Sequence, residues 1–209
     1  MALANHDRTL LQCRGLFLEY DQQVMIDRFG LKADDTFLYL PFLGKEHRID
    51  RASGLVERPE GPGGGFAPAP FCSAMSIYDY LCRSKPCAYP AGRYARIGSL
   101  GGAARASNPD DTLYQNWAAL FETDLPAFRR ACRALGGTEL NFGDAAYQIN
   151  MFPSLAYQLR LWLSDDEFPA DLQILCDENT LDFVCFETSF FMAGQLLTEV
   201  KELFQSLRS

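Results

Sequence analysis

Histidine is scarce in this chain of 209 residues, which contains only His6 and His47. Imidazole is a common ligand of zinc and iron, so we do not expect a histidine-rich metal site. The seven cysteines include no Cys-x-x-Cys pair, and Cys82 and Cys87 are the closest two. An odd number of cysteines without a secretion signal predicts reduced thiols that act mainly as small buried hydrophobic residues.

Signals for export or membrane insertion are also missing. The N-terminus, "MALANHDRTLLQC", has no basic start followed by an apolar run, so we expect neither a signal peptide nor a transit peptide. The longest apolar runs are far shorter than the roughly 20 residues that a membrane-spanning helix needs. We therefore expect a soluble cytoplasmic protein that does not contact a membrane.

The common catalytic motifs are not found in the sequence. "GPGGG" is followed by Phe66 and Ala67 rather than by the Lys-Ser/Thr of a phosphate-binding loop. There is no Gly-x-Gly-x-x-Gly fingerprint, no Gly-x-Ser-x-Gly elbow and no His-Glu-x-x-His motif. These absences favour a protein without a nucleophilic catalytic set.

Charge is distributed unevenly along the chain, whose net charge is −8. Residues 144–209 hold 11 acidic and 3 basic residues, so the whole imbalance lies in the last third. An acidic chain repels a polyanion, and we therefore expect no nucleic-acid partner. One segment, from Ser84 to Pro109, has no acidic residue but contains Lys85, Arg93, Arg96 and Arg105. These bases either hold a small anion or, more simply, face the acidic last third.

The first half of the chain predicts short helices and strands. Residues 7–29 form a helix in two pieces, with Asp21 as a cap and Gly30 as the stop. "TFLYLPFLG" and "KEHRID" predict a hairpin with turns at Gly44 and Gly54, in which Pro41 belongs to an edge. The proline- and glycine-rich residues 57–71 are expected to be a loop.

Helices and a strand follow. "SAMSIYDYLCRSK" predicts a helix capped by Ser73, and "GRYARIGSLGG" predicts a strand that ends in a glycine turn. Another helix starts at Asp110–Asp111. The next helix has Asp124 as its cap, and glycines end it.

The last third is the clearest part. "AAYQINMF", "AYQLRLWL" and "LQILCD" alternate apolar and polar residues, which is typical of an antiparallel meander with one apolar face. A helix over about 188–207, apolar at helical spacing, is expected to cover that face. The predicted fold class is therefore α+β, an antiparallel sheet covered by helices, in one domain over residues 1–209.

Three stretches carry a family resemblance: "FGDAAYQINMFPSLAYQLRLWLSDDEFPADLQILCDE", "IYDYLCRSKPCAYPAGRYARIGSLGG" and "RACRALGG". They resemble the prokaryotic family catalogued as domain of unknown function 3786, found chiefly in anaerobic bacteria and archaea, over nearly the whole chain. Some relatives bear an iron–sulfur module, which implies a role in anaerobic redox or corrinoid-linked metabolism. This sequence departs from them, since no cysteine cluster has ferredoxin spacing.

The acidic row Asp165, Asp166 and Glu167 allows two interpretations. Oxygen ligands suit a divalent metal, and Asp165, Glu167 and Asp177 would be its ligands if the strand ending at Asp177 pairs beside the Trp162 strand. In the simpler interpretation, the row is a solvated turn in which an Asp caps backbone N–H groups while Phe168–Pro169 packs against the sheet. The second interpretation is preferred.

Three functions follow. The favoured one is a non-catalytic accessory or small-ligand-binding domain of anaerobic metabolism, which binds a small anion near Arg93, Arg96, Trp162 and Asp165. The second is a divalent-metal-assisted enzyme that uses the acidic row. The third is a structural or homo-oligomeric module that exposes aromatics such as Phe186 or Phe191. The cofactor is otherwise unknown.

Overall fold

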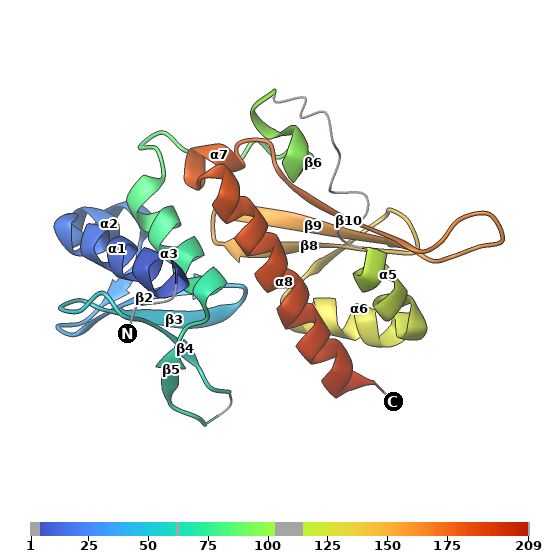
Figure 1. Cartoon of the computed structure of the whole chain (residues 1–209), viewed down its shortest axis with the longest axis horizontal. Coiled ribbons are helices and arrows are strands. Elements are labelled where there is room, and N and C mark those ends of the chain that lie inside the picture. Colours follow the sequence, from blue (N-terminus) through green and yellow to red (C-terminus); the bar gives the residue numbers. More distant parts are fainter. Residues whose placement is uncertain (1–4, 62, 103–114, 209) are drawn as a thin grey trace.

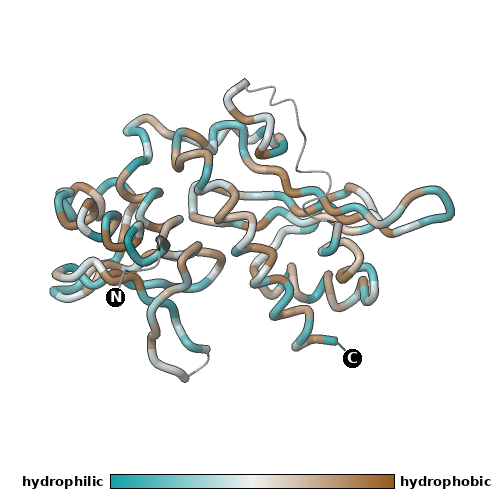
Figure 2. Tube along the Cα trace, viewed as in Figure 1, coloured by the Kyte–Doolittle hydropathy of each residue, from teal (hydrophilic) through white to brown (hydrophobic). Residues whose placement is uncertain are grey.

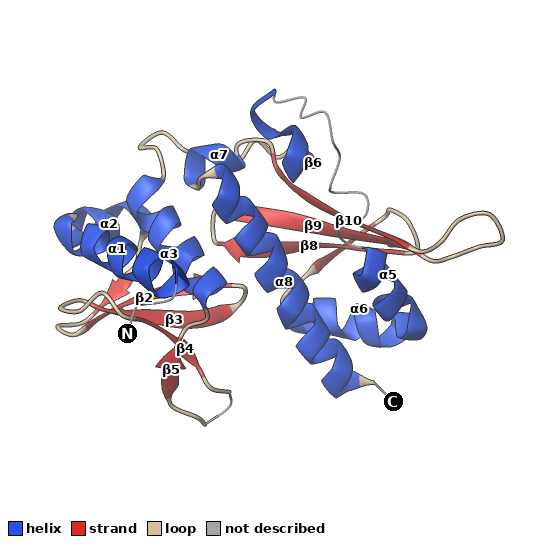
Figure 3. Cartoon of the chain, viewed as in Figure 1, coloured by secondary structure: helices blue, strands red, loops and turns tan. Residues whose placement is uncertain are grey.

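The computed structural model of the chain describes residues 5–61, 63–102 and 115–208 (Figures 1 and 3). Two antiparallel sheets are present, with strand orders β1-β2-β3-β4-β5 and β6-β10-β9-β8-β7. The predicted α+β class is thus confirmed. The strands are β1 (Lys32–Ala33), β2 (Phe37–Phe42), β3 (Lys45–Asp50), β4 (Val56–Pro59), β5 (Phe66–Pro68), β6 (Tyr94–Arg96), β7 (Thr138–Leu140), β8 (Ala145–Phe152), β9 (Leu155–Trp162) and β10 (Asp171–Asp177).

Helices pack on both sheets. Figure 1 shows α1 to α3 beside the N-terminal sheet, and α8 running diagonally across the strands of the C-terminal sheet with α6 close to its C-terminal half. The α-helices are α1 (Asn5–Glu19), α2 (Gln22–Phe29), α3 (Phe71–Arg83), α5 (Gln115–Phe121), α6 (Leu125–Ala134), α7 (Thr180–Phe183) and α8 (Phe186–Leu207), and the 3-10 helices are η1 (Ile97–Gly102) and η2 (Glu122–Asp124). In the described residues, no helix is both long and apolar enough to cross a membrane.

Predicted caps define three helix boundaries. Asp21 accepts hydrogen bonds from the backbone N–H groups of Gln23 and Val24, at 2.9 and 3.3 Å, and therefore begins α2. Gly30 ends α2 in the left-handed conformation, with φ of 60°. Asp124 begins α6 by accepting from the N–H of Ala127 at 2.9 Å. These three predictions are confirmed, whereas the helix start predicted at Asp110–Asp111 lies outside the described residues.

Ser73 does not cap α3, so that prediction is wrong. The helix begins two residues earlier, at Phe71, and the position before it is Pro70, which has no side-chain capping bond. Ser73 is buried within the first turn. The earlier start places the ring of Phe71 against Phe191 of α8, at 5.4 Å between centroids. The first turn of α3 is thus joined to α8 by an aromatic contact between segments far apart in the sequence.

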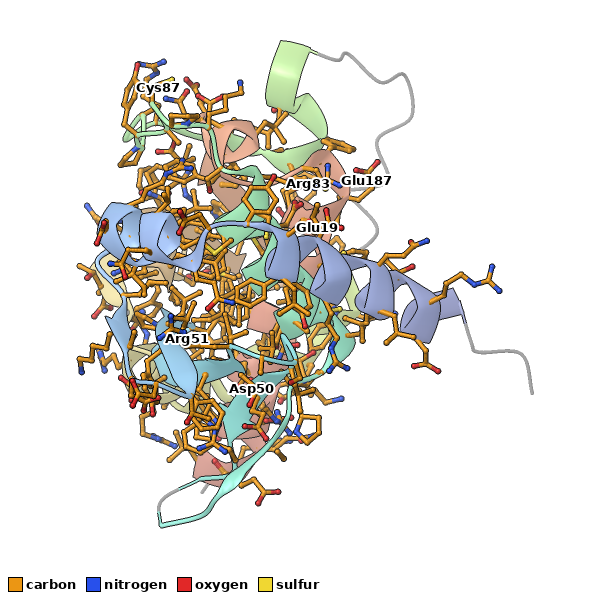
Figure 4. The ribbon with its side chains drawn as sticks, turned by 90° about the vertical axis from the view of Figure 1, so that its left-hand side faces the viewer. Glu19, Asp50, Arg51, Arg83, Cys87 and Glu187 are labelled. Carbon is orange, nitrogen blue, oxygen red and sulfur yellow. The ribbon has the colours of Figure 1, made fainter. Side chains whose placement is uncertain are left out.

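The N-terminal sheet contains the predicted hairpin and two further strand pairs, β1–β2 and β4–β5, that the sequence patterns do not predict. Pro41 pairs only with Glu46, because β1 reaches no further along β2 than Tyr39. A proline without an N–H fits such a locally open edge. Within the predicted loop 57–71, β4 and β5 form a hairpin, and only the residues between them form a turn. Figure 4 labels Asp50, the last residue of β3, and Arg51, which follows it in the connection to β4.

A cation–π sandwich explains the extra hairpin. The guanidinium of Arg48 lies 4.0 Å from the ring centroids of both Phe37 and Phe66, and its Nε binds Glu57 at 2.7 Å. Stacking of this kind stabilises a β5 strand that proline and glycine would otherwise leave as loop. The sequence-based prediction of loop is therefore wrong for 57–59 and 66–68.

The C-terminal meander is confirmed. β9 pairs antiparallel with both β8 and β10, and Tyr147, Ile149, Tyr157 and Leu159 on one face are fully buried. Helix α8 covers that face, where the Tyr157 hydroxyl donates to the Ser189 carbonyl at 3.3 Å. Figure 2 shows the apolar residues concentrated along these strands and along α8, whereas the long β9–β10 loop is mostly hydrophilic.

The two sheets meet at the tip of the β2–β3 hairpin. The N–H of Leu43 donates to the carbonyl of Met151 in β8 at 3.0 Å, and the rings of Phe42 and Phe152 lie 4.9 Å apart. Leu43 has φ of 50°, in the left-handed region that residues other than glycine seldom adopt. Packing at the tip of the hairpin stabilises this backbone conformation. The buried residues of the two sheets and of the helices packed on them form one continuous hydrophobic cluster.

Candidate functional site

The acidic row is a capped turn between β9 and β10. The Oδ1 atom of Asp165 accepts from the N–H groups of Glu167 and Phe168 at 2.9 and 2.8 Å. These bonds lower the pKa of Asp165, so its carboxylate stays charged at neutral pH. The capping part of the preferred interpretation is therefore confirmed. Phe168, by contrast, is 66% exposed, so the prediction that it packs against the sheet is wrong.

Asp177 lies at the opposite end of β10 from this turn. β10 does pair beside the Trp162 strand, but the antiparallel register places Asp171, and not Asp177, opposite Trp162. Asp177 is 1% exposed and accepts from the backbone N–H groups of Ala91, Gly92 and Asn179, each at 2.8 Å. The structure therefore does not bring Asp177 together with Asp165 and Glu167. In the described residues, no group of three or more His, Cys, Asp or Glu side chains is arranged to hold a metal.

A surface cavity lies at the β9–β10 loop end of the C-terminal sheet. Its volume is about 620 Å³, within the range of sites that hold small organic molecules. Three of the four predicted ligand residues line it together: Arg96 from β6, Trp162 from β9 and Asp165 from the loop. The other lining residues are Asp144, Leu163, Phe168, Pro169, Ala170, Asp171 and Gln173.

Arg93 lies outside this group. Its guanidinium binds Glu178 at 2.8 Å, beyond the far end of β10. Lys85 likewise pairs with Asp182 at 2.6 Å. The interpretation that the basic segment faces the acidic last third is thus confirmed for these two bases. Arg105 lies outside the described residues.

Trp162 is half-buried and is held by the loop before β8. A Cβ atom built on Gly143 would lie 3.0 Å from Cε2 of the indole and 2.6 Å from the Leu161 carbonyl oxygen. The close approach therefore requires glycine at this position. Next to it, Asp144 accepts from the Leu163 N–H at 2.8 Å and fixes the chain where β9 ends.

Sequence reasoning missed Asp144 and Asp171 as cavity residues. Asp171 accepts from the side-chain amide of Gln173 at 3.0 Å, two residues further along the same strand. A signal was present, because alternation in "DLQILCD" places Asp171 and Gln173 on the face opposite the buried Leu172 and Ile174. The sequence contains no comparable signal for Asp144, whose position depends on the β7–β8 connection.

The exposed aromatics expected for an assembly surface are half-buried. Phe191 packs on Phe71, and the ring of Phe186 lies 5.3 Å from that of Phe190. Cys82 and Cys87, the two cysteines closest in sequence, do not form a common site. Cys82 is buried, whereas Cys87 is exposed and is labelled at the edge of Figure 4. None of the seven cysteines, all of which are described, forms a disulfide.

The chain matches a known family model over most of its length. The family model described as domain of unknown function (DUF3786) matches residues 21–199, which include every strand of both sheets and the whole cavity wall described above. Comparisons with curated proteins and with solved structures found no match. Because the match covers most of the sequence, the chain belongs to the DUF3786 family.

Proposed function

We propose that this protein is a non-catalytic domain that binds a small organic molecule in the cavity beside Trp162, in the cytoplasm of an anaerobic prokaryote. The observation that carries the proposal is the convergence of Arg96, Trp162 and Asp165, from three separate segments, on one cavity of about 620 Å³. An aromatic side chain with a few charged and amide groups around it is the usual composition of a small-molecule site.

The chemistry of the wall supports binding over catalysis. Its described residues include no Ser, Cys, His or Lys side chain that would serve as nucleophile or general base. The carboxylates of Asp144 and Asp165 already cap backbone N–H groups, which is a structural task. A metal-assisted reaction has less support because Asp177 is remote from the acidic row, and an assembly module has less because Phe186 and Phe191 are half-buried.

A thermal-shift screen of small metabolites tests the proposal. We expect at least one compound to raise the melting temperature of the wild-type protein, since a ligand that binds only the folded state stabilises it. The Trp162→Leu variant should reduce this shift, because Trp162 is the tryptophan of the cavity wall. Trp117→Leu is the matched control, because it removes the other tryptophan without touching the cavity. If both variants respond like the wild type to every stabilising compound, the cavity is not the binding site.

A further inference from the structure

The cavity wall holds three carboxylates that pair with no described base; the nearby Arg129 donates to the main-chain carbonyl of Asp144, and its salt bridge is with Glu139. Asp144, Asp165 and Asp171 all line the cavity, and none of the three forms a salt bridge within the described part of the chain. Each uses one carboxylate oxygen to accept from a backbone N–H or from an amide. The second oxygen of each carboxylate has no donor among the described residues.

Arg96 is the one basic residue in the described wall, and it lies away from these carboxylates along the sheet. It pairs with Leu175, whereas Trp162 pairs with Asp171 on the other side of the same strand. The two register positions are four residues apart on β10, which corresponds to roughly 13 Å along an extended strand. This is a separation of backbone positions, and in the described residues Arg96 forms no salt bridge with Asp144, Asp165 or Asp171.

We infer that the ligand of this cavity carries an organic cationic group, an inference that rests on the proposed function. The cationic group binds against the indole of Trp162, among the carboxylates of Asp144, Asp165 and Asp171. An indole face attracts an ammonium, amidinium or guanidinium group, and nearby carboxylates strengthen that attraction. This charge is opposite to that of the small anion which the basic segment predicts, because only Arg96 from that segment reaches the described wall.

The geometry favours an organic cation over a metal ion. No group of three or more metal-ligating side chains is arranged around an ion in the described residues, as noted above for the acidic row. A cavity of about 620 Å³ is also far larger than one ion needs. Phe168, 66% exposed at the cavity, adds a second aromatic surface for the apolar body of such a ligand.

Three probes of one shape and different charge test the inference: benzamidine, a cation; benzamide, which is neutral; and benzoate, an anion. Binding is followed by NMR through the indole N–H signal of Trp162, which is assigned with a Trp117→Phe variant because Trp117 is the only other tryptophan. We expect benzamidine to bind with a Kd on the order of 1 mM, as suits a fragment of this size. Benzamide should bind about fivefold more weakly, and benzoate more weakly still.

Two single-charge variants locate the effect. Asp171→Asn should weaken benzamidine about threefold or more, while Asp166→Asn removes a charge from the adjacent loop, outside the cavity wall, and should leave the affinity unchanged. Tighter binding of benzoate, lost in Arg96→Gln, would overturn the cationic ligand but keep the cavity as a binding site. Equal effects of the two Asn variants, or no movement of the Trp162 signal with any probe, would overturn the inference, whereas the proposed function is decided separately by the metabolite screen.

Discussion

Gly143 packs directly against the indole ring of Trp162. A Cβ at this position would lie 3.0 Å from Cε2 and 3.1 Å from Cδ2 of the ring, and 2.6 Å from the Leu161 carbonyl oxygen. The φ angle of Gly143 is +53°, which also disfavours other residues. One glycine therefore lets the β7–β8 loop support the central aromatic residue of the cavity.

Gly143→Ala is expected to lower the free energy of unfolding by about 2–3 kcal/mol, because it adds a backbone clash to the cost of positive φ. The control is Gly136→Ala, where φ is +75° but a Cβ would meet nothing within 4 Å. That control should cost only about 1 kcal/mol. Urea denaturation measures both. Equal losses would mean that the contact with Trp162 does not restrict position 143.

Asp177 is expected to be a structural residue. Asp177→Ala leaves the N–H groups of Ala91, Gly92 and Asn179 without their acceptor, and should lower the free energy of unfolding by about 3 kcal/mol or more. Asp166→Ala, at an exposed position of the acidic row, should change it by no more than about 0.5 kcal/mol. Denaturation with calcium, magnesium or manganese present checks the alternative: if the stability of the wild type rises with a metal and that of the Asp177 variant does not, Asp177 is a ligand.

His47 should make stability fall on mild acidification. Burial lowers the pKa of His47; the hydrogen bond to the Lys45 carbonyl and the charge of Glu199 oppose this shift, and the positive charges of Lys45 and Arg58 add to it. The unfolded chain, with a histidine pKa near 6.5, therefore takes up the proton first as the pH falls. The free energy of unfolding consequently decreases below about pH 6.5.

The control for that prediction is the other histidine. His47→Gln should flatten the decrease between pH 7 and pH 5 more than His6→Gln, which replaces an exposed side chain. Urea denaturation at a series of pH values measures the slope. A slope that is the same in wild type and His47→Gln would show that other groups cause the pH dependence.

Local patterns in the sequence were enough to predict much of the fold. Asp21 and Asp124 are helix caps because a short acidic side chain can bind the free N–H groups of its own first turn, which needs no distant partner. The meander and α8 follow from alternation and helical spacing over long segments. These features are encoded by neighbouring residues.

The errors concern contacts between distant segments. The β4–β5 hairpin depends on Arg48 stacking with Phe66, and the first turn of α3 contacts α8 through Phe71 and Phe191. Asp177 was grouped with Asp165 because the sequence places both near strand ends, but only the antiparallel register shows that these are opposite ends. Asp144 is likewise absent from the predicted site, because only the folded β7–β8 connection brings it to the cavity.

A native mass spectrum shows whether the cavity beside Trp162 holds a small molecule. The protein is purified without oxygen, as wild type and as Trp162→Leu, and both spectra are recorded before and after addition of the compound that most stabilises the wild type in the thermal-shift screen. We expect an adduct of small-molecule mass on the wild type that is lost or strongly reduced in Trp162→Leu. An adduct retained in full by Trp162→Leu, or a bare wild-type chain in every spectrum, would show that this cavity is not a binding site.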